Sequence, residues 1–268
     1  MKSVVVTGST RGIGLGLARA FLDRGCAVTI SGRGQDAVDR VVAELAAYAT
    51  PDRVHGYPCD VSRVDQVQAL WDAAASRWGR VDLWVNNAGV GVARAPIWEQ
   101  PPELVHSVIA TNVVGAIHGS SVAIRGMLGQ GSGALYNMEG LGSDGRQVAG
   151  LAVYGSSKAA LRYLDKALIA EVKATPVIVG IVSPGMVITD MILEPYRGKP
   201  AEWAQAKKIF NIIADRVETV CPWLVDRMLG NNRNGARFHW LTGGKAAWRF
   251  ATAPLSRRNL FSGIEEPA

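Results

Sequence analysis

Short runs of β-branched and apolar residues alternate with longer helix-like segments along most of this chain, and this alternation constrains its fold more than any other feature. Such alternation is typical of βαβ units, which form a parallel sheet covered by helices on both faces. We expect strands at Ser3–Val6, Ala27–Ser31, Arg53–Cys59, Val81–Val85, Gly133–Met138 and Val177–Ser183, and helices at Ile13–Arg24, Asp36–Tyr48, Val64–Trp78, Glu103–Met127 and Leu151–Lys173.

The 268 residues are most simply explained by one α/β domain with a doubly wound parallel sheet of about seven strands. We expect the sheet core in residues 1–183. Beyond it, residues 184–236 hold helices at Ala201–Ala214 and Val217–Met228. This segment follows the carboxyl end of a strand, where a substrate lid would lie. Residues 237–268 form a basic tail, in which Arg237–Thr242 is a candidate last strand.

Basic residues are in excess, and the excess is concentrated near the C-terminus. The formal net charge at pH 7 is +6, and the segment from Cys221 onward contains seven Lys and Arg against three acidic residues, interleaved with aromatic ones. Two interpretations stay open: a solvated or packed basic surface, and a tail that makes at most peripheral contact with a membrane. No block of like charges or nucleic-acid-binding module occurs, so we expect no nucleic-acid partner.

The three cysteines have neither disulfide nor metal-ligand spacing, so we expect no disulfide framework and no metal site. Cys26 and Cys59 lie in apolar, strand-like runs, and we expect them to be buried thiols. Met1-Lys2-Ser3 leads directly into the first strand, without room for a signal sequence, and we expect a cytoplasmic protein. The longest stretch without Lys, Arg, Asp or Glu is Leu104–Ile124. Because it contains several polar side chains, it indicates a core helix and not a membrane span.

A glycine-rich loop, Thr7–Gly14, joins the first predicted strand to the first predicted helix. Glycines let the backbone approach a pyrophosphate, and the helix N-terminus offers free N–H groups. Turns are also rich in glycine, but a position between strand and helix is the context that a dinucleotide-binding Rossmann motif requires. The sequence therefore predicts a Rossmann fold with a dinucleotide bound at Gly8, Ser9, Thr10, Arg11, Gly12, Ile13 and Gly14.

The end of the second predicted strand indicates which dinucleotide binds. An NAD enzyme usually places an acidic residue there, which accepts hydrogen bonds from ribose hydroxyls. This sequence reads Ser31-Gly32-Arg33, without a carboxylate. Arg33 and Arg11 could bind a 2′-phosphate through charge-assisted hydrogen bonds, although Arg33 could also be an exposed loop residue. The residues favour NADP(H).

Tyr154 and Lys158 lie four residues apart in a predicted helix, so their side chains emerge on one face. A tyrosine has an ordinary pKa of about 10, too high for efficient proton exchange near neutrality. A lysine ammonium nearby would lower that pKa, and Tyr154 could then protonate a carbonyl oxygen while hydride arrives. Tyr-x-x-x-Lys alone is common by chance. Its position in the helix after the fifth strand gives it weight.

Together these motifs resemble the short-chain dehydrogenase/reductase family over at least Lys2 to Thr189. Further matches are Asn86-Asn87-Ala88-Gly89 and Pro184-Gly185. The resemblance implies an oxidoreductase, a homodimer or homotetramer, and roles for several residues. Asp60 and Val61 would contact adenine; Asn87, Ala88 and Gly89 the cofactor ribose; and Lys158 also the nicotinamide ribose. Asn112 would hold a relay water, and Pro184, Gly185, Val187 and Thr189 would cover the nicotinamide.

One position departs from the family pattern. Most members have a serine thirteen residues before the catalytic tyrosine, where this chain has Leu141, and the nearest aliphatic hydroxyl is on Ser143. Ser143 either binds the substrate oxygen or only shapes a turn. The run Asn137–Ser143 resembles the chlorophyll b reductase branch, which reduces a formyl group with NADPH. Residues of the predicted lid, Gly185–Asp190 and Phe210–Ala214, also resemble that branch.

Three hypotheses for the function follow. The first is an NADPH-dependent reductase of an aldehyde or ketone, such as the formyl group of chlorophyll b or a similar bulky apolar molecule. The second is a reductase or dehydrogenase of an unrelated metabolite on the same scaffold. The third is a catalytically silent NADP(H)-binding sensor. The intact residues Tyr154, Lys158 and Asn112 argue against the third.

Overall fold

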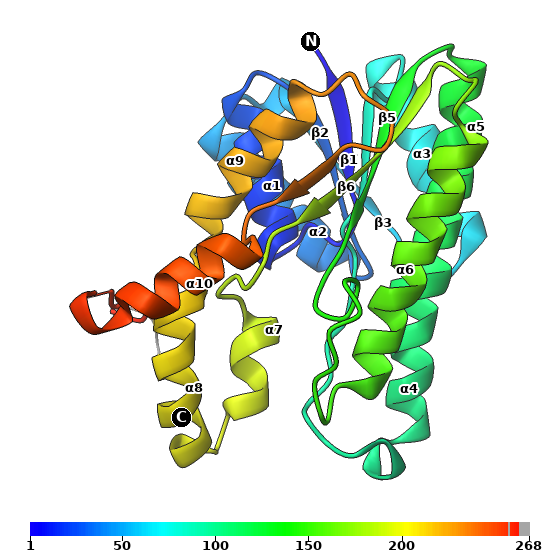
Figure 1. Cartoon of the computed structure of the whole chain (residues 1–268). Coiled ribbons are helices and arrows are strands. Elements are labelled where there is room, and N and C mark those ends of the chain that lie inside the picture. Colours follow the sequence, from blue (N-terminus) through cyan, green and yellow to red (C-terminus); the bar gives the residue numbers. More distant parts are fainter. Residues whose placement is uncertain (257, 263–268) are drawn as a thin grey trace.

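Seven parallel strands form one sheet in the computed structural model of the chain, which describes residues 1–256 and 258–262 (Figure 1). The strand order is β3-β2-β1-β4-β5-β6-β7, so the direction of strand addition reverses between β1 and β4. In such a sheet, ligands bind beyond the carboxyl ends of the strands at the reversal. The strands are β1 (Ser3–Val6), β2 (Ala27–Gly32), β3 (Val54–Pro58), β4 (Leu83–Asn86), β5 (Gly133–Met138), β6 (Val177–Ser183) and β7 (Arg237–His239).

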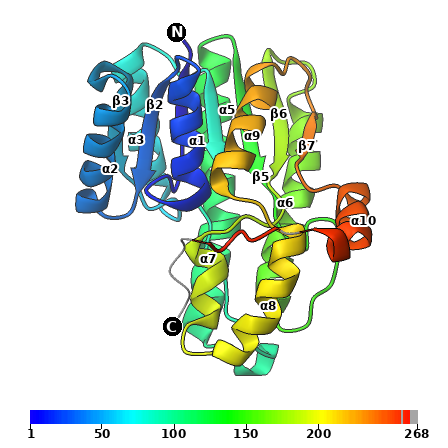
Figure 2. The ribbon, with the colours of Figure 1, turned by 90° about the vertical axis from the view of Figure 1, so that its left-hand side faces the viewer.

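Helices cover both faces of the sheet (Figure 2). One face packs against α1 (Gly12–Asp23), α2 (Gln35–Tyr48) and α9 (Val217–Leu229). The other packs against α3 (Val64–Trp78), α5 (Gly115–Gly129) and α6 (Ala152–Glu171). Strand β1 shows how the sequence supports two cores, because Val4 and Val6 belong to the first and Val5 to the second. A strand buried on both faces reads as an uninterrupted apolar run. The predicted doubly wound fold is confirmed.

Beyond β6, the chain forms a smaller layer at the carboxyl edge of the sheet. It consists of α7 (Asp190–Leu193), a 3₁₀ turn at Glu194–Tyr196 and α8 (Pro200–Ile213). This layer has its own core, built around Trp203, Phe210 and Phe261. Phe261 comes from the C-terminal segment, which crosses the layer after α10 (Gly243–Thr252) and a 3₁₀ turn at Ala253–Leu255.

Three expectations about elements were wrong in detail. The predicted helix Glu103–Met127 is divided into α4 (Pro102–Ile109), a π-helical turn at Ala110–Val114, and α5. A wider turn of this kind is frequent at functional sites. The sequence analysis did not predict α10, which begins with two glycines and is capped by the Thr242 hydroxyl. The last strand ends at His239 and not at Thr242.

The basic tail is largely engaged within the protein. Asp215 forms ion pairs with Arg249 and Arg258, and Glu139 forms one with Arg237. The ammonium of Lys245 lies 3.3 Å from the ring centroid of Trp240. Much of the positive charge of the tail is therefore engaged in contacts within the protein. Arg257, Glu265 and Glu266 lie outside the described residues.

Two further features agree with expectation. Cys26 and Cys59 are buried free thiols, and so is Cys221. Within the described residues, Pro102–Gly129 is the one helical stretch long and apolar enough to cross a membrane by length and composition. In this fold its α5 part packs against α3 and the sheet, as predicted for a core helix.

Candidate active site

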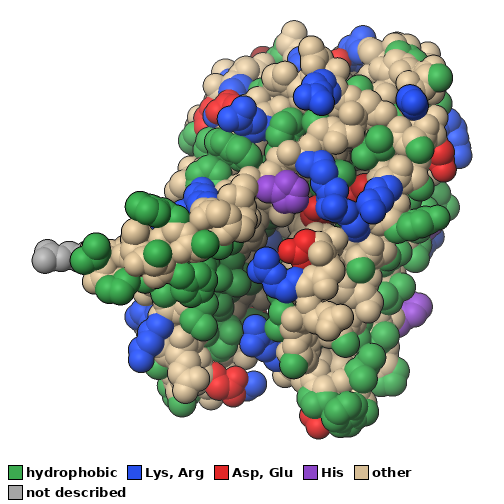
Figure 3. All heavy atoms as spheres, viewed as in Figure 1, with side chains coloured by type: hydrophobic (Ala, Val, Ile, Leu, Met, Phe, Trp, Pro, Cys, Tyr) green, Lys and Arg blue, Asp and Glu red, His purple; other side chains and the backbone are tan. Residues whose placement is uncertain are grey.

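A cavity of about 530 Å³ opens at the carboxyl ends of the strands. The space-filling view shows this region hollowed, with hydrophobic side chains gathered along one wall (Figure 3). The predicted site residues that line the cavity are Gly8, Thr10, Arg11, Gly12, Ile13, Gly14, Arg33, Asp60, Val61, Asn87, Ala88, Gly89, Ser143, Tyr154, Lys158, Pro184, Gly185, Val187 and Thr189. Ser9 and Asn112 are the two predicted site residues that do not line it.

The loop after β1 exposes backbone to this cavity. Gly8 and Gly12 have φ angles of 61° and 56°, in the left-handed region that favours glycine. A β-carbon on Gly14 would lie 2.3 Å from the carbonyl oxygen of Gly8, so no side chain fits there. Asn87 fixes the loop by donating hydrogen bonds from Nδ2 to the carbonyl oxygens of Thr7 and Gly8. The three glycines thus leave backbone exposed at the N-terminus of α1, which fits a pyrophosphate.

Ser9 supports this loop from behind. Its side chain is fully buried, its Oγ donates to the Val6 carbonyl at 2.6 Å, and it accepts from the Ser31 backbone N–H at 2.9 Å. Ser9 therefore ties the loop to β2. Its place in the loop was predictable from the glycine-rich pattern, but the direction of its side chain was not.

The corner beyond β2 is positively charged. Arg11 and Arg33 both line the cavity there, and Gly32 supplies no carboxylate at the end of the strand. Asp60, which follows β3 and lines the same cavity, accepts hydrogen bonds from the backbone N–H and the hydroxyl of Ser62. Arg11 also lies 3.6 Å from Asp190, and both side chains are mostly exposed. These residues fit a dinucleotide that carries an additional phosphate on its ribose.

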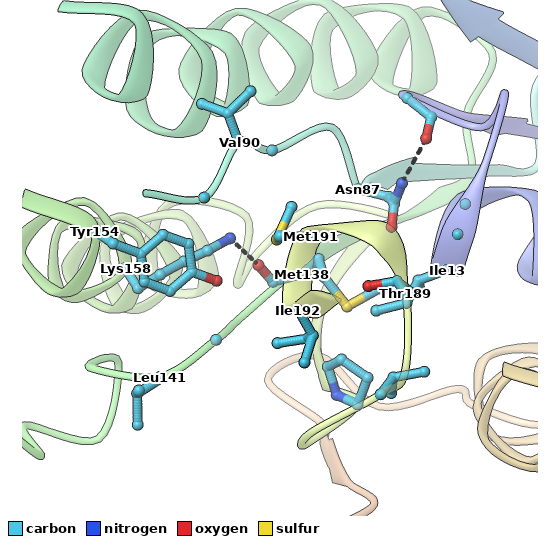
Figure 4. A pocket seen from close by; sticks show the side chains of 18 of the residues that line it. Ile13, Asn87, Val90, Met138, Leu141, Tyr154, Lys158, Thr189, Met191 and Ile192 are labelled. Atoms are coloured by element: carbon cyan, nitrogen blue, oxygen red, sulfur yellow. Dashed lines mark hydrogen bonds between the residues drawn. The ribbon is translucent and has the colours of Figure 1, made fainter. Parts of the chain in front are cut away.

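Tyr154 and Lys158 project side by side from α6 into the cavity (Figure 4). Lys158 is buried, and its Nζ donates to the Met138 carbonyl oxygen at 3.1 Å. Burial lowers the pKa of Lys158 to about 8, although the carboxylates of Asp165 and Glu139 oppose that change. A group that gains and loses a proton near neutrality suits proton-transfer chemistry.

The pKa of Tyr154 differs from the expected direction. Burial raises it to about 12, whereas the sequence analysis expected Lys158 to lower it. The lysine Nζ lies 5.8 Å from the centroid of the tyrosine ring and is already bonded to Met138. Desolvation of the phenolate therefore outweighs the attraction of the ammonium in this structure. A neutral phenol is the form that can donate a proton to a carbonyl oxygen.

Asn112 connects two segments of the cavity wall through hydrogen bonds. It lies in the π-helical turn and is almost fully buried. Its Oδ1 accepts from the Val90 backbone N–H at 2.8 Å, and its Nδ2 donates to the Val90 carbonyl and to Ser157 Oγ. Asn112 thus links the loop after β4 to α6, the helix of Tyr154 and Lys158. These hydrogen bonds occupy the side-chain amide of Asn112. Its role in holding a water of a proton relay stays a prediction.

The loop after β5 shows which residue stands at the tyrosine hydroxyl. A β-carbon on Gly140 would lie 2.7 Å from Tyr154 Oη, closer than any real β-carbon would approach. Ser143 is buried, and its Oγ donates to the Gly140 carbonyl oxygen at 2.8 Å. In this structure the serine hydroxyl shapes the turn. The spacing in sequence before the tyrosine could not identify Gly140, because the conformation of the loop determines which residue lies beside the hydroxyl.

Two buried acids near the site were not among the predicted site residues. Glu139, directly after β5, is 2% exposed and is paired with Arg162 and Arg237. Asp165, on α6, is fully buried and accepts a hydrogen bond from Asn137. Asp165 lies seven residues after Lys158, which places both on one face of the helix. That spacing was the available sequence signal.

The remaining wall of the cavity is mostly apolar and belongs to the layer after β6. A β-carbon on Gly91 would lie 3.0 Å from Met191 Cγ, so α7 closes against the loop after β4. Thr189 lies over Gly12 in the same way. The layer thus occupies the position predicted for a lid. Its apolar and aromatic lining side chains are Met186, Met191, Ile192, Pro195, Tyr196, Phe210 and Ile213, and its polar ones are Thr189 and Asp190.

Comparison with known proteins agrees with this geometry. Residues 2–197 match the family model described as short chain dehydrogenase. A chlorophyll(ide) b reductase NOL of Oryza sativa is 35% identical, over 97% of this chain and 77% of its own length. The protein of Arabidopsis thaliana described as a probable chlorophyll(ide) b reductase NYC1 is 34% identical over 97% of this chain. The chain spans 54% of that relative's length, about half.

Solved structures show the same architecture. A crystal structure of an actinorhodin polyketide ketoreductase with NADPH superimposes with a TM-score of 0.80 at 27% identity, covering 91% of this chain and 97% of the other. A closed form of serine dehydrogenase complexed with NADP+ superimposes with a TM-score of 0.74 at 26% identity, covering 88% and 94%.

Proposed function

Because this chain belongs to the short-chain dehydrogenase/reductase family of oxidoreductases, we propose that it reduces a carbonyl group with NADPH, and that the carbonyl is the formyl group of a chlorophyll b-type tetrapyrrole. The observation that carries the proposal is the full extent of the similarity to chlorophyll(ide) b reductases. It covers 97% of this chain and therefore includes the segment after β6 that lines the cavity.

The catalytic roles follow from the site. When bound, NADPH would supply the hydride. Tyr154 donates its phenolic proton to the carbonyl oxygen as negative charge develops there. Lys158 stabilises the phenolate that is left, because its ammonium is held on the same face of α6. Asn112 and Ser157 keep α6 and the loop after β4 in register, so that the donor stays in place during proton transfer.

NADPH is favoured over NADH by the charges at the adenosine end. Arg33 is exposed at the end of β2, and within the described part of the chain no ion pair neutralises it. A guanidinium in this position offers paired N–H donors to a phosphate dianion. An unphosphorylated ribose would leave that charge without a partner.

A bulky apolar substrate is favoured by the lid. Most of its cavity-lining residues are apolar or aromatic, with Thr189 and Asp190 as the polar ones. Two methionines are among them, and methionine side chains adapt to irregular surfaces. A planar macrocycle with a formyl group on its edge could enter such a site.

NADPH consumption provides the test. The purified chain should be mixed with NADPH and, in parallel, with chlorophyll b, chlorophyllide b, simple aldehydes or a ketosteroid, with Tyr154→Phe as the inactive control. We expect reduction of the formyl tetrapyrroles to the hydroxymethyl products. Activity only toward the other carbonyls would identify a reductase of an unrelated metabolite. NADPH binding without consumption in any mixture would identify the silent sensor.

A further inference from the structure

Asp165 is a fully buried acid that the proposed catalytic steps leave unexplained. Its Oδ1 accepts a hydrogen bond of 2.6 Å from Asn137 Nδ2. Its Oδ2 is also buried and has no hydrogen-bond partner among the described residues. A buried carboxylate oxygen without a hydrogen-bond partner costs folding free energy. We therefore expect Asp165 to have a role beyond packing.

The position of Asp165 connects it to the catalytic lysine. Lys158 and Asp165 lie two helical turns apart on one face of α6, and both side chains turn toward β5. The lysine binds the carbonyl of Met138, and the aspartate binds the side chain of the preceding residue, Asn137. Asn137 is held in turn by Asn86 of β4 at 2.8 Å. The two groups are thus anchored to consecutive residues at the end of β5.

We propose that Asp165 is a positioning residue whose buried carboxylate is the counter-charge that keeps Lys158 protonated beside Tyr154. Asn137 fixes the carboxylate in place. The inference rests on the proposed roles of Tyr154 and Lys158 in carbonyl reduction. It explains why the lysine retains a cation at a depth where burial alone would remove it.

The other charged groups near Asp165 are Glu139, after β5, and Arg162, on α6. Burial, with a smaller contribution from Glu139, raises the pKa of Asp165 to about 7, while Asn137, Arg162 and Lys158 oppose that change. The pKa of Lys158 is about 8. Both buried groups are therefore charged together only in a narrow interval near neutral to slightly alkaline pH, and the proposed pairing operates there.

The pH profile of Asp165→Asn tests the proposal. Asparagine keeps the shape of the side chain and can still accept the bond from Asn137, so a merely structural role would survive the change. Without the carboxylate, Lys158 should lose its proton at lower pH. We expect kcat to equal that of the wild type near pH 6, where Asp165 is already protonated, and to be lower by roughly tenfold near pH 9.

A matched control and a stability measurement accompany this variant. Asp226→Asn removes an exposed carboxylate that is paired with Arg24 at 2.6 Å, and its pH profile should match the wild type. Near pH 6 the melting temperature of Asp165→Asn should match that of the wild type, because the variant replaces a carboxyl group that is already protonated. An active, stable Asp165→Asn enzyme with the wild-type profile would overturn the proposal while leaving the proposed reductase intact.

A measurement without turnover separates this inference from the proposed function. The carboxyl carbon of Asp165 can be titrated by NMR in the wild-type chain and in Lys158→Met. Loss of the lysine cation should move the titration of Asp165 to higher pH, because its charged form loses an attractive neighbour. An identical midpoint in both chains would overturn the pairing, whatever the substrate proves to be.

Discussion

The α-carbon of Gly140 faces the hydroxyl of Tyr154 so closely that a β-carbon on Gly140 would lie 2.7 Å from Tyr154 Oη. The same β-carbon would lie 3.2 Å from Cε of Lys158. The loop after β5 thus approaches the proton donor with backbone alone. Gly140 does not have a positive φ, so any residue could adopt its backbone conformation. Glycine is needed here only because a side chain would not fit beside the tyrosine hydroxyl.

We therefore expect Gly140→Ala to fold normally and to lose activity. The tyrosine hydroxyl is the far end of a side chain and can move, so the fold tolerates the methyl group by displacing the proton donor. A displacement of about 1 Å can cost roughly 10²-fold in rate. The variant should show a lowered kcat for any carbonyl substrate, at unchanged NADPH affinity.

Gly155→Ala is the matched control for this substitution. Gly155 follows Tyr154 in α6, and a β-carbon there would meet nothing within 4 Å. Alanine in a helix is more stable than glycine by about 0.5–1 kcal/mol, so this variant should melt higher and retain its kcat. Equal activity of both variants would contradict the close approach of Gly140 to the tyrosine.

Ser143→Ala distinguishes the two roles that the sequence left open. The hydroxyl is bonded to the Gly140 carbonyl, so we expect a loss of about 1 kcal/mol in unfolding free energy and a kcat within a few-fold of the wild type. Thermal melting and steady-state kinetics on one preparation give both values. A kcat loss of about 10²–10³-fold at unchanged stability would instead assign to Ser143 the binding of the substrate oxygen.

Tyr154→Phe should abolish most turnover and spare cofactor binding. General acid catalysis contributes about 10²–10⁴-fold, and the phenol of Tyr154 projects from α6 into the cavity. NADPH affinity, followed by the fluorescence of the bound cofactor, should stay near the wild-type value. Turnover close to normal would remove Tyr154 from the mechanism.

Arg33→Asp should change the choice of cofactor. The substitution removes a phosphate partner and adds repulsion, so kcat/KM should fall more for NADPH than for NADH. Arg40→Asp, an equal change of charge on the exposed side of α2, controls for the overall field. The assignment of Arg33 would be refuted if the ratio of kcat/KM for NADPH to kcat/KM for NADH stayed at the wild-type level in both variants.

The sheet and the glycine loop were predictable because their patterns are local. An apolar run such as Val4-Val5-Val6 needs cover on both faces, and the residue types around Gly8 and Gly14 permit few backbone shapes. The site was harder, since it depends on which way side chains point. Ser9 belongs to the predicted loop yet faces the core, and Asn112 braces the site without lining its cavity.

The pKa of Tyr154 shows a further limit of sequence reasoning. The spacing to Lys158 correctly placed both groups on one helical face, but the degree of burial follows from the tertiary packing of the lid and the loops. Gly140 and Asp165 were missed for the same reason. Their roles arise from contacts with residues of other elements, and the local sequence pattern does not indicate which residues make those contacts.

Phe261 connects the C-terminal segment to the substrate wall. It is 4% exposed, and its ring packs perpendicular to that of Trp203, with 4.9 Å between the centroids. Trp203 in turn contacts Tyr196 and Phe210, which line the cavity. Arg216 holds the segment in place by donating to the Leu260 carbonyl oxygen at 2.8 Å.

Phe261→Ala should therefore disturb substrate binding from outside the cavity. Removing a buried phenylalanine side chain costs about 3–5 kcal/mol where the site cannot collapse, and here that loss falls on the lid core. We expect a lower melting temperature and a raised KM for a bulky carbonyl substrate, with unchanged NADPH affinity. Leu255→Ala, at a residue 87% exposed in the same segment, should change none of these values. If Phe261→Ala weakened NADPH and substrate equally, the C-terminal segment would stabilise the whole domain and not the lid in particular.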